Sequence, residues 1–441
     1  SHQSYPHKML TGRKDAFLYE EHYDDVSGYS SPHESEHDHF TIGHTSTSVS
    51  LACGLAKGRD LKGEDGNVVA IIGDGSLSGG EALEALDYAA ELDGNLIILV
   101  NDNDMSIAEN HGGLYQNLRL LRETGGKAEC NLFRAMGLDY RFVADGNDIA
   151  SLIEAFKTVK DSTQPVVVHI VTQKGKGYQP ALDNPTKFHG LGSYCVRDGE
   201  TQAAPTPTFS HIFGSTLVEM AREDESITAI TAAMASGTKL DLFKEAFPKR
   251  YFDVGIAEEH GALFACGLAA EGMKPYIAIY STFMQRCIDM IQHDAALQKL
   301  PVRFCMDRAG LSPDDGPTHH GLFDIAMIRS IPNIVFMQPK DEAEFVHMLR
   351  TMNHYQNGPT VIRYPRGCGA GTPVPAKAEI LPIGKAEVLQ TGRDVTLVSL
   401  GTMIGIARET ASLLEARGYT VTLNRPADRM YVDALISLSV A

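Results

Sequence analysis

The 441-residue sequence contains no apolar run near the roughly 18 residues of a membrane-spanning helix, and residues 1–8 lack the apolar core of a signal peptide. Its seven cysteines are scattered without a C-x-x-C pair, which indicates reduced thiols in a cytoplasmic compartment. Basic residues are outnumbered, with 39 Lys and Arg against 56 Asp and Glu. Such a chain lacks the basic footprint of a general nucleic-acid or anionic-membrane binder. We therefore expect a cytoplasmic protein that binds neither.

The chain has no solenoid repeat, and its pattern is typical of several α/β domains. Apolar runs such as VVAII, NLIILV and PVVVHIV alternate with amphipathic stretches at 80–92 and 149–160, as in β-α-β units. A proline-bearing polar linker, RDGETQAAPTPT, precedes a second series: ITAITAA, YFDVGIA, KPYIAIYS, PVRFCMD and NIVFMQP. DVTLVSL, a helix at 404–417 and YTVTLNR then follow. We predict two doubly wound, mostly parallel-sheet domains at 1–200 and 207–370 and an incomplete third α/β domain at 377–441.

Two polar loops follow neighbouring strands of the first predicted domain. VVAII runs into GDGS at 73–76, and NLIILV runs into NDNDM at 101–105. In a right-handed crossover the two strands share one sheet, so Asp74 and Asn103 emerge at the same carboxyl edge. Magnesium prefers a few oxygen ligands and completes its shell with phosphate and water. A GDG sequence alone is more often a plain turn, but the NDN sequence after the next strand favours a metal site.

GDG and NDN at this spacing resemble the thiamine diphosphate motif of the transketolase-like enzymes. That resemblance implies that Asp74, Asn103 and the carbonyl oxygen of Met105 bind Mg²⁺ and that Gly75 and Ser76 lie against the diphosphate.

In the second predicted domain, Glu258 and Glu259 follow the strand-like YFDVGIA and directly precede an apolar helix at 261–270. Acids there could simply cap the helix. However, GIAEEH resembles the IAEQH segment of the same family, which implies that Glu258 hydrogen-bonds the cofactor's aminopyrimidine and promotes its imino tautomer. Glu259 replaces the usual glutamine and is expected to be a bystander.

Longer strings narrow the resemblance. SHQSYPHKMLTGR, TIGHTSTSVS, VTQKGKGYQP, KFHG, AIYSTFMQR, DRAGLSPDDGPTHHGLFD and VIRYPRG together resemble the 1-deoxy-D-xylulose-5-phosphate synthase family along the whole chain. The resemblance implies a homodimeric transferase that uses thiamine diphosphate and Mg²⁺. Its substrates would be pyruvate and D-glyceraldehyde 3-phosphate, and its products CO₂ and 1-deoxy-D-xylulose 5-phosphate, a precursor for isoprenoid, thiamine and pyridoxal biosynthesis.

The resemblance also implies roles by position. The implied cofactor-binding residues are His2, Gly43, His44, Thr45, Gly75, Ser76, Asn103, Tyr178, Glu258 and Phe283. The implied anchor of the aldehyde phosphate consists of Tyr280, Arg308 and Arg366, because guanidinium groups bind phosphate through paired hydrogen bonds. The implied catalytic residues are Glu258, His189, His319 and Asp315, and Arg286 is a weaker candidate.

The stretch HESEHDH at 33–39 has the ligand types of a zinc site but no helical spacing that would support one, so a solvated acidic loop is the preferred interpretation. Two rival functions stay open. One is a transketolase-type enzyme acting on ketose phosphates, and the other is a non-catalytic cofactor-binding subunit. The set Asp74, Asn103 and Glu258 argues against the second.

Overall fold

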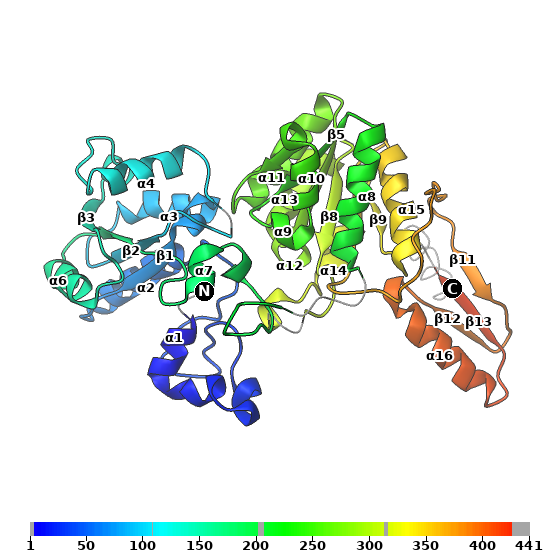
Figure 1. Cartoon of the computed structure of the whole chain (residues 1–441), viewed down its shortest axis with the longest axis horizontal. Helices are drawn as coiled ribbons and strands as arrows, with labels where there is room; N and C mark the ends of the chain where they lie inside the picture. The colour runs from blue at the N-terminus through cyan, green and yellow to red at the C-terminus, as the bar shows by residue number, and fades with distance from the viewer. Residues whose placement is uncertain (1–3, 108, 202–206, 313–315, 426–441) are drawn as a thin grey trace. The chain divides into compact units, whose positions relative to one another are not determined.

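The computed structural model describes residues 4–107, 109–201, 207–312 and 316–425. The chain divides into two compact units, each built from discontinuous segments (Figure 1). The four-stranded unit comprises His44–Ala203 and Gly255–Ala257. The six-stranded unit comprises Ser1–Gly43, Ala204–Val254 and Glu258–Ala441.

The four-stranded unit is a parallel sheet in the order β1-β2-β4-β3. Its strands are β1 (Val69–Gly73), β2 (Ile97–Asp102), β3 (Asp139–Val143) and β4 (Val166–Val171). Its helices are α2 (Ser48–Lys62), α3 (Gly80–Ala89), α4 (Gly113–Glu123), α5 (Leu132–Ala135), α6 (Ile149–Val159) and α7 (Gln179–Asp183), with short turns η4 (Asp74–Ser78) and η5 (Lys187–His189).

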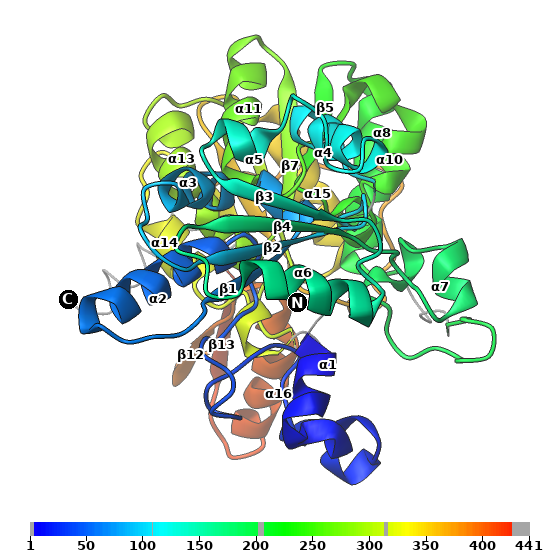
Figure 2. The same ribbon diagram turned by 90° about the vertical axis from the view of Figure 1, so that its left-hand side faces the viewer.

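Alternate residues of these strands face opposite sides of the sheet. On one side, Ile98 and Val100 join a core with α2, α3 and α4. On the other, Ile97 and Leu99 pack with Val159 of α6, which lies across the face turned to the viewer in Figure 2. Helices therefore cover both faces, which explains why these strands read as continuous apolar runs.

The second unit contains a parallel sheet in the order β6-β5-β7-β8-β10-β9. The strands are β5 (Ile227–Thr231), β6 (Tyr251–Asp253), β7 (Lys274–Tyr280), β8 (Arg303–Asp307), β9 (Val335–Met337) and β10 (Thr360–Arg363). The helices are α8 (Phe209–Glu223), α9 (Ala235–Thr238), α10 (Asp241–Ala246), α11 (Glu258–Ala270), α12 (Ser281–Met284), α13 (Ile288–Met290), α14 (Asp324–Arg329) and α15 (Glu342–His354). Short turns are η6 (Pro248–Arg250), η7 (Gln285–Cys287), η8 (Ile291–Ala296) and η10 (Pro317–His319).

This sheet is also covered on both sides. Phe213 of α8 and Phe345 of α15 share a core with one face of the strands. On the opposite face, a Cβ atom on Gly261 of α11 would lie 3.1 Å from Cδ1 of Ile277, so the helix backbone approaches β7 closely. The two sets of helices flank the strands in Figure 1. The α/β fold with two doubly wound parallel sheets is therefore confirmed.

The same unit carries a third sheet in the order β11-β13-β12, formed by β11 (Glu387–Gln390), β12 (Val395–Val398) and β13 (Val421–Arg425). A short turn η11 (Gly401–Met403) and α16 (Ile404–Glu415) accompany it. Strands β12 and β13 are parallel, whereas β11 pairs antiparallel with β13. The sequence predicted β12, α16 and β13 but gave no sign of β11, whose exposed EVLQ stretch is too short and too polar.

The N-terminal part of this unit is a series of short helical turns rather than strands: α1 (Ser4–Lys8), η1 (Met9–Arg13), η2 (Lys14–Phe17) and η3 (Glu20–Asp25). Across the described residues, no helix combines the length and the apolar character needed to cross a membrane. All seven cysteines are free thiols. The proposed domain boundaries at 1–200, 207–370 and 377–441 stay a prediction.

Candidate active site

The GDGS and NDNDM loops meet at one edge of the four-stranded sheet. Asp74 begins η4 directly after β1, and Asn103 and Met105 follow β2, the hydrogen-bonded neighbour of β1. The Asp74 carboxylate accepts backbone hydrogen bonds from Asn103 and Met105. It also accepts a hydrogen bond from Nδ2 of Asn110 at 2.8 Å. The structure thus brings the three predicted metal ligands together and adds Asn110, which the sequence motifs did not indicate.

Two features of this edge fit a divalent cation. Burial raises the pKa of Asp74 to about 7, and the nearby carboxylate of Asp102 contributes to the rise. A bound cation would favour the ionised form of such a carboxylate. In addition, Oδ1 of Asn103 is buried and has no hydrogen-bond partner among the described residues. An unsatisfied buried oxygen beside a carboxylate is suited to Mg²⁺, which takes oxygen ligands.

The predicted diphosphate loop is closely packed. A Cβ atom on Gly75 would lie 2.7 Å from Cβ of Ser106, so a side chain at this position would push the two loops apart. The hydroxyl of Ser46 donates to the carbonyl oxygen of Ser76 at 2.8 Å. This bond ties the segment that contains His44 and Thr45 to the GDGS turn. Ser46 was not predicted from the sequence, since its partner lies 30 residues away.

Lys174 joins the KGKGY segment to two other predicted parts of the site. Its ammonium group donates to the carbonyl oxygen of Ser106 at 2.5 Å and lies 3.0 Å from Nδ1 of His189. Burial lowers the pKa of Lys174 to about 8, although the negative charge of Asp74 opposes this shift. His189 is therefore adjacent to the metal loop, whereas the hydroxyl of Tyr178 donates to the carbonyl oxygen of Val196 at 2.7 Å.

A buried polar network supports the loop that follows β2. The carboxylate of Asp102 accepts hydrogen bonds from Arg122 at 2.8 and 2.7 Å and lies 2.8 Å from Nε2 of His169. Nδ1 of His169 is 2.7 Å from the hydroxyl of Tyr140. Burial alone would raise the pKa of Asp102, but the bonds to His169 and Arg122 hold it below its ordinary value. Asp102 therefore anchors the strand end from which Asn103 projects.

Glu258 occupies the first position of α11 in the six-stranded unit and is only 3% exposed. Burial raises the pKa of its carboxyl group, the positive charge of Arg286 opposes the rise, and Glu259 adds to it. The Nη1 atom of Arg286 lies 3.5 Å from Oε2 of Glu258. A buried carboxyl group with a raised pKa can share a proton with a nitrogen base, as predicted from the sequence.

Several predicted residues of this unit form a continuous row of rings. The guanidinium carbon of Arg308 lies 3.6 Å from the ring centroid of Tyr280. Tyr280 stacks on Phe283 with centroids 5.9 Å apart, and Phe283 meets His319 edge to face at 5.4 Å. The row connects the predicted phosphate anchor with the predicted proton-transfer group. Gly43 belongs to the same neighbourhood, because its missing side chain leaves room for Thr318.

Arg308 and Arg366 follow neighbouring parallel strands. Arg308 comes directly after β8, and Arg366 comes three residues after β10, which pairs with β8. Nη1 of Arg308 lies 3.3 Å from Oδ1 of Asp307, and Arg308 also donates to the carbonyl oxygen of Gly237 at 3.3 Å. Arg366 is exposed. Both arginines emerge at the same carboxyl edge, while their joint grip on a phosphate stays a prediction.

The predicted roles of His2 and Asp315 fall outside the described residues. Most of the histidine-rich stretch at 33–39 is exposed, as predicted for a solvated loop, but Asp38 departs from that prediction. Asp38 is buried and accepts hydrogen bonds from Arg13 at 2.8 Å, which hold its pKa below the ordinary value. Glu34 pairs with Lys8 at 2.5 Å. Cations from the first turns pair with both acids, of which Asp38 is buried and Glu34 is partly buried. Within the described ranges, no group of three or more His, Cys, Asp and Glu side chains is arranged to hold a metal ion.

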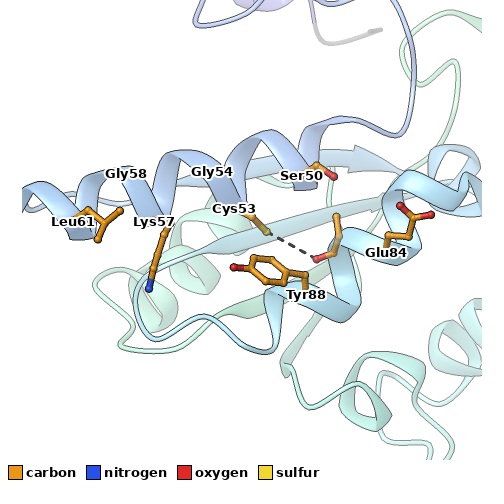
Figure 3. A pocket seen from close by; sticks show the side chains of 9 residues that line it. Ser50, Cys53, Gly54, Lys57, Gly58, Leu61, Glu84 and Tyr88 are labelled. Carbon is orange, nitrogen blue, oxygen red and sulfur yellow. Dashed lines mark hydrogen bonds between the residues drawn. The ribbon is translucent and has the colours of Figure 1, made fainter.

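A cavity of 610 Å³ lies between α2 and α3 of the four-stranded unit (Figure 3). None of the predicted site residues lines it. Its wall includes Cys53, whose thiol donates to the carbonyl oxygen of Ala85 at 3.9 Å, and Tyr88 of α3. Burial raises the pKa of the Cys53 thiol, so this thiol is not an activated nucleophile.

Comparison with protein families gives three consecutive matches. Residues 1–130 and 123–172 match a family described as 1-deoxy-D-xylulose-5-phosphate synthase. Residues 206–370 match the transketolase pyrimidine binding domain. Residues 384–430 match the transketolase C-terminal domain.

Individual relatives extend over nearly the whole chain. The 1-deoxy-D-xylulose-5-phosphate synthase of Methylacidiphilum infernorum is 46% identical over 97% of this chain and 73% of its own length. That of Desulforudis audaxviator is 45% identical over 95% of this chain and 71% of its own. Among solved structures, a split gene transketolase described as an inactive beta4 tetramer is 31% identical, with a TM-score of 0.45, and covers 49% of this chain and 70% of its own.

Proposed function

This chain belongs to the 1-deoxy-D-xylulose-5-phosphate synthase family and is a transferase of the transketolase class, and we propose that it decarboxylates pyruvate and transfers the two-carbon unit to D-glyceraldehyde 3-phosphate. The products are CO₂ and 1-deoxy-D-xylulose 5-phosphate. Thiamine diphosphate, when bound, supplies the electron sink for the decarboxylation. The protein's own residues bind, orient and exchange protons.

One observation carries the proposal at the residue level. Asp74 and the unsatisfied Oδ1 of Asn103 are buried side by side after adjacent strands, and the backbone of Met105 touches the same carboxylate. These oxygens support a Mg²⁺ site in which the diphosphate completes the coordination. Gly75 and Ser76 form the turn beside it, with His44 and Thr45 next to Ser46, so a diphosphate would approach backbone rather than bulky side chains.

Glu258 is proposed to hold a proton for the cofactor's aminopyrimidine. Its burial favours the protonated form, which can donate a hydrogen bond to a ring nitrogen. Phe283 lies in α12, the helix that directly follows β7, and is proposed to offer an aromatic face to the same ring. The residues Tyr178 and His2 complete the proposed cofactor set.

The acceptor phosphate is assigned to Arg308 and Arg366, with Tyr280 as the platform on which the Arg308 guanidinium lies. His189 and His319 are proposed to move protons at the reacting atoms, since an imidazole can do so near neutral pH. His189 is supported by its contact with Lys174 beside the metal loop. Asp315 is proposed to act with them.

We also propose that the enzyme is a cytoplasmic homodimer. Seven free thiols support a reducing compartment. Light scattering coupled to size-exclusion chromatography tests the assembly, and a mass of one chain in dilute and concentrated samples alike would contradict it.

The reaction is tested by supplying ¹³C-labelled pyruvate with Mg²⁺, thiamine diphosphate and glyceraldehyde 3-phosphate. The expected result is labelled CO₂ together with a five-carbon ketose phosphate that retains the methyl group of pyruvate. Ketol transfer from xylulose 5-phosphate without release of CO₂ would instead identify a transketolase-type activity. Cofactor binding without turnover on either donor would identify a non-catalytic subunit.

A further inference from the structure

A buried ion pair joins the end of β10 to the start of α14. Arg363 is the last residue of β10 and is 6% exposed, and Asp324 is the first residue of α14 and is 1% exposed. Nε of Arg363 donates to Oδ2 of Asp324 at 2.8 Å. The two residues belong to VIRYPRG and DRAGLSPDDGPTHHGLFD, which carried the family resemblance, but the resemblance implied no role for either of them.

The protein itself occupies the guanidinium group of Arg363. Besides the bond to Asp324, Nη1 donates to Oε1 of Gln338 at 2.6 Å, and Nη2 donates to the carbonyl oxygen of Gly321 at 3.3 Å. Each of the three nitrogens therefore has a protein acceptor, and burial separates the group from a substrate phosphate. Arg366, three residues later, is exposed, so the two arginines of VIRYPRG differ in what they can bind.

The carbonyl group of Gly321 lies at the base of the loop that carries His319. Gly310 and Gly321 exchange two backbone hydrogen bonds of 2.9 and 2.8 Å, which close this base. Within the loop, the His319 ring stacks on Tyr29, 290 residues earlier in the chain, with centroids 4.9 Å apart, and meets Phe283 edge to face. The guanidinium bond to the Gly321 carbonyl therefore fixes the point at which this loop leaves the sheet.

Asp324 extends the same network to the helix that carries Phe283. Its Oδ2 atom also accepts a hydrogen bond from the hydroxyl of Ser281 at 2.9 Å, and Ser281 is the first residue of α12 and is 2% exposed. Ser281 lies against the loop base as well, because a Cβ atom on Gly321 would be 2.5 Å from its Oγ. One carboxylate thus ties the start of α12 to Arg363 and to the base of the loop.

We propose that Arg363 and Asp324 are positioning residues that hold the loop of His319 and the start of α12 in one fixed arrangement. The proton-transfer group and the aromatic ring beside it then face the reacting atoms together. Desolvation offsets most of the attraction within a buried ion pair, so the pair is a weak source of stability, whereas its charge-assisted hydrogen bonds have a strict geometry. The inference rests on the proposed function for the reaction that is affected but not for the arrangement itself.

Ser281→Ala tests the link to α12 and leaves the ion pair intact. It should lower kcat by about fivefold, the worth of one ordinary hydrogen bond, with phosphorylated and non-phosphorylated glyceraldehyde alike, while the KM values stay within twofold or so. Ser215→Ala is the matched control, because the hydroxyl of Ser215 donates to carbonyl oxygens of its own helix, α8. A KM increase confined to the phosphorylated acceptor would indicate direct phosphate binding. A lower melting temperature with kcat per folded molecule unchanged would indicate a purely structural role, and either result would overturn the proposal.

A double-mutant cycle tests whether Ser281 acts through the carboxylate. Asp324→Asn removes the charge and weakens both bonds at Oδ2, so kcat should fall further than in Ser281→Ala. In the double variant, the loss of the Ser281 hydroxyl should change kcat by less than about twofold, because its partner is already impaired. Additive losses would show that Ser281 and Asp324 act independently, which would overturn the proposed network.

Amide hydrogen exchange gives a readout that does not depend on turnover. In Ser281→Ala, peptides that cover residues 316–324 should exchange about fivefold faster than in the wild type, since the loop base loses one hydrogen bond of support. Peptides from β8 and β10 should exchange as in the wild type, because the sheet itself is unchanged. Unchanged exchange at 316–324 would overturn the proposal whether or not the chain turns over pyruvate.

Discussion

Asp74 is the single residue on which the metal and diphosphate loop depends most. Its carboxylate is buried, and the backbone of Asn103 and Met105 and the side chain of Asn110 all bond to it. We expect Asp74→Ala to weaken Mg²⁺-dependent binding of thiamine diphosphate by roughly a hundredfold or more, since even residues that only orient metal ligands contribute up to that amount. Isothermal titration calorimetry measures the affinity. The control is Asp87→Ala, an exposed carboxylate on α3, and equal affinity in both variants would remove Asp74 from the site.

Substitution of Glu258 is expected to affect proton exchange on the cofactor rather than the affinity for the cofactor. Glu258→Ala should retain the cofactor but slow exchange of the thiazolium proton by roughly a hundredfold or more, the usual scale for losing a positioned acid or base. Exchange into D₂O followed by proton NMR gives the rate. Glu259→Gln serves as the matched control and should exchange nearly as the wild type does. Wild-type exchange in Glu258→Ala would contradict the assignment.

Arg308 and Arg366 are expected to act specifically on the phosphate of the acceptor. Replacing either with alanine should reduce kcat/KM for glyceraldehyde 3-phosphate by about 2 to 4 kcal/mol in transition-state terms, as for a charge pair broken in a shielded site. Non-phosphorylated glyceraldehyde should be affected much less. Arg222→Ala, an exposed arginine on α8, is the control. An equal loss on both aldehydes would mean that the arginines only hold their own loops.

At the level of elements, the sequence predicted best where strands are buried on both faces. The apolar runs of β2, β4, β5, β7 and β8 were located to within a few residues because a parallel sheet covered by helices needs continuous apolar strands. Strand β1 was located as well, although Val69 and Ile71 are exposed at the sheet edge. Strand β3, with the sequence DYRFV, lies at the sheet edge and is partly exposed. Its charged residues interrupt the apolar pattern, so the sequence did not predict it. The antiparallel strand β11 is also partly exposed and was not predicted for the same reason.

The sequence predicted the site residues that directly follow strands, but not those that reach the site through tertiary contacts. Asp74 and Asn103 follow strands, so the edge of the sheet brings them together as predicted. Asn110, Lys174 and Tyr29 reach their partners across 36, 68 and 290 residues, and no local pattern announces such contacts. The burial of Asp38 was mispredicted for the same reason, since its partner Arg13 lies in a different turn.

For the molecule as a whole, ligand binding should appear as thermal stability. Mg²⁺ and thiamine diphosphate together, at about a hundredfold excess over their dissociation constants, should stabilise the unit that binds them by roughly 3 kcal/mol. Either ligand alone should do much less, because each supplies binding groups for the other. Differential scanning calorimetry measures the shift, which Asp74→Ala should lack. A full shift with Mg²⁺ alone would show that the protein holds the ion without the diphosphate.

The contact between Tyr29 and His319 also has a consequence for the order in which the chain folds. The N-terminal 43 residues belong to a unit whose other segments are translated after residue 203, so they leave the ribosome long before their partners exist. Contacts of such large sequence separation form slowly. The ion pairs of Lys8 with Glu34 and of Arg13 with Asp38 lie within the early segment, but a few ion pairs alone stabilise a solvated segment too little to protect it. In stalled nascent chains, we expect residues 1–43 to stay sensitive to pulse proteolysis until residue 319 has emerged, and earlier protection would contradict this order.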